Sequence, residues 1–348
     1  MNINDPTYSS FALVQEMMDT VQVIRNFDPN QTRELADEVR KTGRLFLAGE
    51  GSSRLFPVKN LIRKNLEAGT GVHIITEGCH QAAEYDLSDY TVFLASNSGR
   101  TKEALLLAEK LSSQNHPSTF SFTSNPDSQL KQLTKQMIVY SCGQEKAVAA
   151  TMSVVEQALL YESVLWHLTG VDGKSKCEQL GLAIEKTLTQ SIDPEIIRLA
   201  SQAPTLYFSG YNDGVAEELT IKTNETARKK SDFLEGTYAV HGIEEVMYKE
   251  DIVFWIDPIE SEIDKFMEVL VQGVGLTVIA ISEKDTPFPT IRVPQSDNMA
   301  AYVFLCTGWN LLVEVGLALG VNLDKPVRAR KVGNEGHVSS TSKNIKVI

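Results

Sequence analysis

Residues 90–108 of the chain read YTVFLASNSGRTKEALLLA, and this stretch decides the fold class. The apolar run Tyr90–Ala95 has the length and the β-branched and aromatic content of a buried strand. The last part, 102–108, has the spacing of apolar residues typical of a helix. Between them lies a polar turn, SNSGRT, at Ser96–Thr101. A strand, a tight turn and a helix in this order indicate an α/β fold.

The turn Ser96–Thr101 has the composition of an anion-binding site. Amide N–H groups at a helix start point outward, and the helix dipole favours negative charge there. The hydroxyls of Ser96, Ser98 and Thr101 can each donate a hydrogen bond to an oxyanion, and Gly99 lets the backbone approach a ligand closely. Hydroxyl residues are also the standard helix caps, so the spacing alone leaves an ordinary N-cap as an equal alternative.

Apolar runs and helical patterns alternate along both halves of the chain. The first half has strand-like runs at 44–48, 72–75, 90–95, 118–122 and 137–140, with helices over 55–67 and 151–168. The second half has runs at 206–210, 252–256, 277–281 and 290–293, with helices over 215–230 and 299–319. Short strands separated by helices imply parallel strands with crossover helices. We therefore predict a duplicated α/β unit, in which the second copy has Asp257–Glu260 where the first has its hydroxyl turn.

The same alternation predicts how the chain is divided. We expect a helical segment over 1–30, a first domain over 31–170, a linker or helix over 171–195, a second domain over 196–325 and a tail over 326–348. Two domains also fit the length of 348 residues.

Composition excludes several classes of function. The net charge of −12 argues against nucleic acid as a partner, because a basic face is the expected footprint there. No apolar run approaches the roughly 20 residues of a membrane helix, and no basic segment leads into an apolar one at the start. The four cysteines form no CxxC pair, and the histidines lack metal-ligand spacing. We expect a cytoplasmic protein with no metal and no membrane association.

Four segments together resemble the tandem SIS (sugar isomerase) domain family, particularly the isomerase half of glucosamine-6-phosphate synthase. They are the turn at 96–101, the glycine turn Gly49–Ser53, the stretch Glu225–His241, and Pro326–Lys331. The resemblance covers nearly the whole chain. It implies two SIS domains in tandem, each a parallel five-stranded sheet flanked by helices in a flavodoxin-like three-layer sandwich.

The resemblance also implies which residues bind the substrate. In the family, the hydroxyl turn binds the phosphate on C6 of a sugar. The residues carried over to this role are Ser96, Asn97, Ser98, Gly99 and Thr101, and Ser53 matches a serine that contacts the sugar from the first glycine turn. Of these, Asn97 and Gly99 would act through their backbone N–H groups. Arg54, like Arg100, could add a cationic contact or face solvent.

Three residues are implied as catalytic. Glu225 stands where the family places the base that moves a proton between C1 and C2. His241, sixteen residues later, matches a histidine that opens the sugar ring and reaches the site from the neighbouring subunit, so the resemblance implies a homodimer. Lys331 stands five residues after Pro326 and matches a lysine that assists ring opening. One carboxylate can carry a proton both ways through a cis-enediol, so no cofactor is expected.

We therefore predict an aldose–ketose isomerase of a small anionic sugar. The expected substrate is a hexose with an anion at C6, a phosphate by family default or a sulfonate as in sulfoquinovose. A fructosamine-phosphate deglycase or aminosugar-phosphate deaminase is the alternative, and a non-catalytic sugar-phosphate sensor is a third. Ala150 and Met152 stand where the synthase has a serine and a lysine, which puts its contacts with the sugar hydroxyls in doubt here.

Overall fold

The computed structural model describes residues 1–338 and 345–347, so the predicted tail 326–348 is described in part. The chain divides into two compact units. One, which contains the turn Ser96–Thr101 and is called the turn unit here, comprises Val23–Glu145, Ala150–Cys177 and Arg330–Ile348. The other contains Glu225, is called the base unit, and comprises Met1–Gln22, Lys146–Ala149 and Glu178–Ala329.

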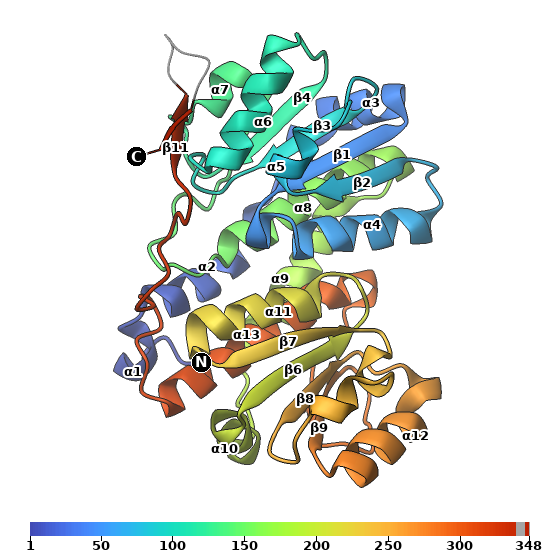
Figure 1. The fold of residues 1–348 in the computed structure, drawn as a ribbon, viewed down its shortest axis with the longest axis vertical. Coiled ribbons are helices and arrows are strands. Elements are labelled where there is room, and N and C mark those ends of the chain that lie inside the picture. The colour runs from blue at the N-terminus through green and yellow to red at the C-terminus, as the bar shows by residue number, and fades with distance from the viewer. Residues whose placement is uncertain (339–344, 348) are drawn as a thin grey trace. The chain divides into compact units, whose positions relative to one another are not determined.

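A parallel five-stranded sheet forms the centre of the turn unit (Figure 1). Its strands are β1 (Arg44–Gly49), β2 (His73–Glu77), β3 (Thr91–Ala95), β4 (Thr119–Thr123) and β5 (Gln136–Val139), in the order β2-β1-β3-β4-β5. All four pairings are parallel. The central strands β3 and β4 are buried along their whole length, as expected of a sheet covered on both faces.

Helices cover both faces of this sheet. They are α3 (Arg33–Thr42), α4 (Phe56–Ala68), α5 (Cys79–Ala82), α6 (Lys102–Ser113), α7 (Leu130–Leu133) and α8 (Met152–Thr169). Because strand side chains alternate between faces, Val92 and Leu94 pack with Leu105 of α6 on one side. Phe93 points to the other side, where its ring lies 5.8 Å from that of Tyr161 on α8. Helix α9 (Gly173–Thr189) follows, where a linker or helix was predicted.

The base unit is built on a second parallel sheet of the same topology. Its strands are β6 (Thr205–Gly210), β7 (Lys230–Glu235), β8 (Ile252–Ile256), β9 (Thr277–Ser282) and β10 (Thr290–Arg292), in the order β10-β9-β8-β6-β7. Counted along the chain, both sheets place their strands in the order 2-1-3-4-5, which is the flavodoxin-like arrangement. The predicted α/β fold with two five-stranded parallel sheets is confirmed.

The helices of the base unit include two, α11 and α13, that pack against each other. The helices of this unit are α1 (Pro6–Ser9), α2 (Ala12–Asn26, which runs on past Gln22), α10 (Pro194–Gln202), α11 (Val215–Lys222), α12 (Ile263–Phe266) and α13 (Ala300–Ala318). Helix α13 passes close to α11 at Gly308, where a Cβ atom would lie 2.3 Å from Leu219. The segment Asp297–Ala318 is long and apolar enough to cross a membrane, but 83% of its most apolar window is buried. A core helix passes the same test.

One element of the base unit differs from the sequence prediction. The helix predicted over 215–230 ends its α-helical part at Lys222 and closes with a π-helical turn, Thr223–Ala227. The edge strand β7 then begins at Lys230. This strand carries a mostly polar sequence with Phe233 and Leu234 as its only apolar residues, so its alternation is weak and the strand was not predicted.

Candidate active site

The two turns predicted to bind substrate lie at the topological switch point of the first sheet. Strands β1 and β3 are neighbours, and their last residues, Gly49 and Ala95, are directly paired. The chain leaves β1 toward β2 on one side and leaves β3 toward β4 on the other. In open α/β sheets, ligands bind in the crevice outside the carboxyl ends of such a strand pair. The short 3₁₀ turn Gly51–Ser53 and the turn Ser96–Thr101 both start there.

The turn Ser96–Thr101 is held in shape by residues that follow β4. The Asn97 carbonyl accepts hydrogen bonds from the Ser124 amide at 2.9 Å and the Ser124 hydroxyl at 2.7 Å. The Gly99 carbonyl accepts from the Ser128 hydroxyl at 2.7 Å. These bonds come from the protein itself, so the turn has its shape before any ligand is bound.

Gly99 is required by conformation and by space. Its φ of 64° lies in the left-handed region, which side chains with a Cβ seldom adopt. A Cβ atom there would lie 2.5 Å from the hydroxyl oxygen of Ser128. The Gly99 amide donates to the Ser96 carbonyl at 2.9 Å, so this residue contributes the shape of the turn.

The hydroxyls of the turn do not act as ordinary helix caps. Thr101 occupies the N-cap position of α6, yet its side chain makes no capping hydrogen bond. Its hydroxyl instead lies 2.8 Å from that of Ser96. Within such a pair one hydroxyl proton is used internally and the other can be donated outward. The Ser98 hydroxyl accepts from the Arg100 amide at 3.1 Å and keeps its own proton for donation. This arrangement favours the anion-binding alternative over the N-cap.

The first turn is tied to helix α8 and to strand β2. The carbonyl of Ser53 accepts a hydrogen bond of 2.7 Å from the side-chain amide of Gln157. Arg54, predicted to contact the substrate or to face solvent, lies 3.8 Å from Glu77 at the end of β2. About a third of the Arg54 side chain is exposed, so its guanidinium borders the same edge of the sheet as the anion turn.

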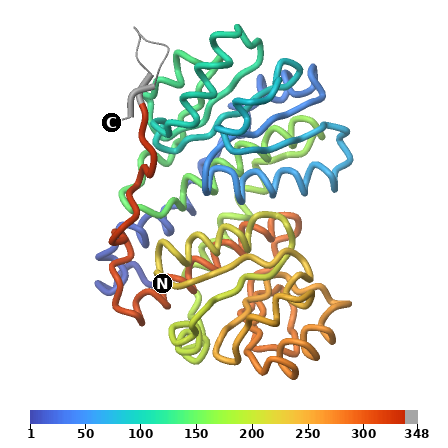
Figure 2. The backbone as a smooth tube through the Cα atoms, in the orientation of Figure 1, coloured from blue at the N-terminus to red at the C-terminus, as the bar shows by residue number. Residues whose placement is uncertain are grey.

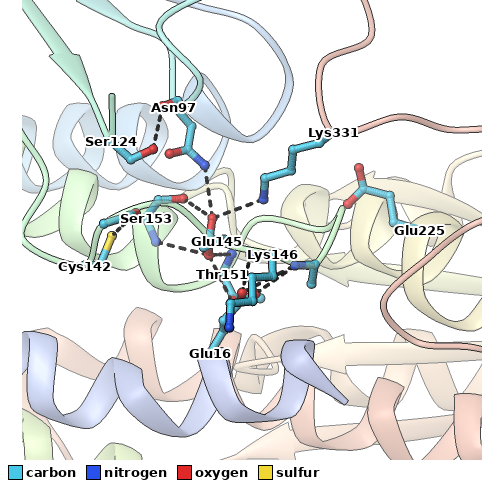
Figure 3. A network of polar contacts seen from close by, with 12 residues as sticks. Glu16, Asn97, Ser124, Cys142, Glu145, Lys146, Thr151, Ser153, Glu225 and Lys331 are labelled. Atoms are coloured by element: carbon cyan, nitrogen blue, oxygen red, sulfur yellow. Dashed lines mark hydrogen bonds and ion pairs between the residues drawn. The ribbon is translucent and has the colours of Figure 1, made fainter. Parts of the chain in front are cut away.

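Glu145 connects the turn to the C-terminal tail (Figure 3). Its side chain is fully buried and accepts from the side-chain amide of Asn97 at 3.0 Å and the hydroxyl of Ser153 at 2.7 Å. The backbone amide of Thr151 donates to its other oxygen at 2.6 Å. The ammonium of Lys331 lies 3.5 Å from the oxygen that Asn97 contacts. The structure therefore brings Lys331 and the turn Ser96–Thr101 to one buried carboxylate.

In the base unit, Glu225 belongs to a buried group of three charged residues. Lys222 is 1% exposed and lies between Glu225 at 2.8 Å and Glu218 at 3.2 Å. Burial by itself would lower the pKa of Lys222, but the charges of Glu225 and Glu218 outweigh it and hold that pKa above its ordinary value. Lys222 therefore stays an ammonium and fixes one carboxylate oxygen of Glu225. The π-helical turn that carries Glu225 is a feature frequent at functional sites.

Glu225 faces an open cavity of about 580 Å³, which is within the range of small-molecule sites. Its side chain is 28% exposed, whereas Glu218 is completely buried. Four of the nine lining residues are basic. The residues around the cavity are Asn224, Glu225, Arg228, Lys229, Lys230, Pro326, Val327, Arg328 and Ala329. Burial lowers the pKa of Lys229.

His241 lies far from Glu225 within one chain. Glu225 precedes strand β7 and His241 follows it, so the two stand at opposite ends of a six-residue strand. At about 3.3 Å per residue, the strand alone separates them by about 20 Å. His241 is exposed and adjoins the short helix Tyr238–Val240. The structure thus does not bring these two predicted residues together in one copy.

Sequence reasoning missed Glu145, Glu218 and Lys222. The last two are recognisable in hindsight, because positions 218, 222 and 225 share one helical face at spacings of four and three. Glu145 carries no such local signal, since its partners come from residues 97, 151 and 331. Among residues 1–338 and 345–347, no group of three or more His, Cys, Asp or Glu residues is arranged to hold a metal ion.

Comparison with known families matches the SIS domain to residues 71–166. These residues run from just before β2 to the end of α8 in the turn unit. A curated relative, the 3-hexulose-6-phosphate isomerase of Mycobacterium gastri, is 25% identical over 194 residues. The match covers 56% of this chain and 94% of that relative.

Solved structures match over both units. The tagatose-6-phosphate ketose/aldose isomerase of Escherichia coli has a TM-score of 0.76 at 19% identity, covering 92% of this chain and 97% of that one. The C-terminal domain of glucosamine-fructose-6-phosphate aminotransferase from Francisella tularensis has a TM-score of 0.74 at 17% identity, covering 90% and 98%. At these identities the likeness concerns the fold, which agrees with the predicted resemblance.

We predict that Gly99→Ala destabilises the turn unit more than Gly69→Ala does. Both glycines have φ near 60°, but a Cβ at Gly69 meets no atom within 4 Å. Gly69→Ala should therefore cost only the left-handed strain of about 1–2 kcal/mol, whereas Gly99→Ala adds a clash worth about 1–3 kcal/mol. Urea unfolding of both variants measures the difference. Equal losses would mean that Ser128 moves aside freely.

We predict that Lys222→Met lowers the free energy of unfolding by about 3–5 kcal/mol, because it leaves buried carboxylates without their counter-charge. Lys265→Met is the matched control, since Lys265 makes an exposed pair with Glu268 at 3.2 Å in the same unit. Its loss should stay below about 1 kcal/mol. Thermal and urea unfolding report both values, and a small effect of Lys222→Met would contradict the buried triad.

Proposed function

Because residues 71–166 match the SIS domain and the two sheets share one topology, we propose that this chain is an aldose–ketose isomerase of a hexose that carries an anion at C6. The observation that carries the proposal is the carboxylate of Glu225. Lys222 holds one of its oxygens at 2.8 Å, and the side chain borders a cavity lined by basic residues. The named isomerase activities of the Mycobacterium gastri relative and the Escherichia coli structure support the reaction class.

In the proposed mechanism, Glu225 moves one proton. As an ionised carboxylate it removes the proton from C2 of the open-chain aldose and returns it to C1, through a cis-enediol. Negative charge develops on the substrate oxygens during this step. The cationic side chains of Arg228, Lys230 and Arg328 around the cavity would stabilise that charge. Lys331 is proposed to assist ring opening.

The turn Ser96–Thr101 is proposed to hold the anion at C6, with Ser53 and Arg54 beside it. A phosphate or a sulfonate offers three similar oxygens to the donors of the turn. Phosphate carries more negative charge at neutral pH, which favours it where charge-assisted hydrogen bonds dominate. A sulfonated hexose remains the second substrate to test.

We propose that His241 acts across the interface of a homodimer. The separation of His241 from Glu225 along β7, about 20 Å, supports a partner's histidine at each site. Apolar side chains surround this exposed residue in the sequence: Tyr238 is 51% exposed, Val246 59% and Tyr248 69%. Exposed apolar residues gathered in one segment are typical of an interaction surface. A cytoplasmic location belongs to the same proposal.

A deglycase or deaminase is the second candidate. The same base would move the same proton, and the difference is the departure of an amine through an enolamine. The C-terminal domain of the Francisella tularensis glucosamine-fructose-6-phosphate aminotransferase has a similar fold, and the name of that enzyme indicates amine chemistry. Release of ammonia or lysine would identify this alternative.

Replacing Glu225 by Gln tests the proposed base. We expect Glu225→Gln to slow solvent-deuterium exchange at C2 at least about 100-fold, while substrate affinity changes little, because the amide keeps the shape of the side chain. Proton NMR in D₂O, with hexose 6-phosphates and 6-sulfonates as substrates, follows the exchange. Glu260→Gln, at an exposed position of the base unit, is the control. Unchanged turnover in Glu225→Gln would show that another group is the base.

Replacing Ser98 by Ala tests the anion turn. We expect Ser98→Ala to weaken binding of sugars with a C6 anion by about 10-fold, the worth of one hydrogen bond to a charged group, and to leave kcat largely unchanged. Calorimetric titration compares the sugar that carries the C6 anion with the unsubstituted hexose, in wild type and in Ser98→Ala, and the difference isolates the contribution of the anion. Ser112→Ala, at an exposed position of α6, is the control variant. Equal affinities of wild type and variant would reject the assignment.

A further inference from the structure

We propose that Arg100 and Glu335 are positioning residues, which latch the tail segment Asn334–Gly336 onto the anion turn and thereby set the place of Lys331. The catalytic meaning of Lys331 rests on the proposed function. The latch itself rests on contacts within the turn unit and can be tested separately. Figure 2 shows the red part of the tail running beside the helix that Figure 1 labels α6.

The first part of the latch is an ion pair with a backbone pairing around it. The guanidinium of Arg100 lies 2.8 Å from the carboxylate of Glu335. Glu335 also forms an isolated antiparallel bridge with Thr101. The amide of Gly336 donates to the carbonyl of Arg100 at 2.9 Å. Arg100 was predicted either to contact the substrate's anion or to face solvent, and the structure pairs it with the tail.

The second part of the latch engages the start of helix α6. The amide of Lys102, the first residue of that helix, donates to the carbonyl of Asn334 at 3.0 Å. The side-chain amide of Asn334 donates to the carboxylate of Glu103 at 2.6 Å. The tail thereby satisfies a helix-start donor that the Thr101 side chain leaves uncapped.

Lys331 lies three residues before this latch. Its ammonium is held at 3.5 Å by Glu145, which also binds Asn97 of the same turn. The tail is therefore fastened to the anion turn on both sides of a short connection, Val332–Gly333. Two fixed ends leave a two-residue connection little conformational freedom, so a change at the latch moves Lys331.

The expected effects on stability and on catalytic rate determine which measurement should detect the latch. The Arg100 and Glu335 side chains are 56% and 30% exposed, and exposed ion pairs add only about 0–1 kcal/mol to stability. A displacement of about 1 Å at a reacting group, in contrast, costs up to about 100-fold in rate. The latch should therefore affect catalysis and local protection far more than the unfolding of the unit.

A charge swap tests the latch. Arg100→Glu, Glu335→Arg and the double variant are compared with wild type in the full chain. We expect each single variant to lower kcat about 10-fold and to speed hydrogen exchange at the amides of Lys102 and Gly336, and we expect the double variant to restore both. The carboxylate introduced by Arg100→Glu repels an anionic substrate and raises KM in that single variant and in the double variant. The value of kcat therefore decides whether the latch is restored. Acylation of the Lys331 amine, followed by mass spectrometry, should be faster in the single variants and normal in the swap.

Arg44 and Asp89 provide the matched control, because they form an exposed pair at 3.7 Å at the amino end of β1, whereas the turn Ser96–Thr101 follows the carboxyl end of β3. Swapping their charges should leave kcat, amide exchange and Lys331 acylation as in wild type. Wild-type exchange in Arg100→Glu, or a double variant with kcat as low as the singles, would overturn the proposal. If wild type isomerises no sugar tested, the proposed function fails, whereas amide exchange and acylation still decide whether the latch positions Lys331.

Discussion

The ammonium of Lys222, removed from water and set between Glu218 and Glu225, is the constraint on which the proposed chemistry depends. An ion with 1% of its side chain exposed is stable only with opposite charge in contact. That requirement fixes the helical face of 218, 222 and 225, and the π-helical turn at Thr223–Ala227 carries Glu225 into contact with it. The proposed base is thereby oriented by the same contact that stabilises the helix end.

The turn unit relies on the same kind of device. Glu145 is buried, and the hydrogen-bond donors of Asn97, Thr151 and Ser153 surround it. Lys331 supplies the remaining positive charge from the tail. Each unit thus uses one buried carboxylate–lysine contact to place a residue predicted to be catalytic, although the two copies of the fold differ in which edge of the sheet carries it.

The sequence was sufficient to predict the duplicated sheet, because buried parallel strands such as β3 and β8 are continuous apolar runs. Strand β7 was missed, since an edge strand with polar residues resembles the end of the preceding helix. The geometry of the site was predictable where it depends on local pattern, as in the strand, turn and helix that contain Ser96–Thr101, whose binding of an anion stays a prediction. It was not predictable where it depends on contacts between distant segments of the chain. The pairing of Glu145 with Lys331 and of Arg100 with Glu335 joins residues far apart in sequence, and no periodicity encodes it.

The hydrogen bonds from Ser124 and Ser128 give the anion turn a fixed shape. A ligand that binds a preformed turn loses little free energy to the ordering of loops. A small ligand that makes few contacts would therefore still bind there at modest concentration. The same stiffness makes the turn a poor host for anions of another shape. A planar carboxylate presents two oxygens where a tetrahedral group presents three, and a turn that cannot rearrange would discriminate against sugar acids by geometry alone.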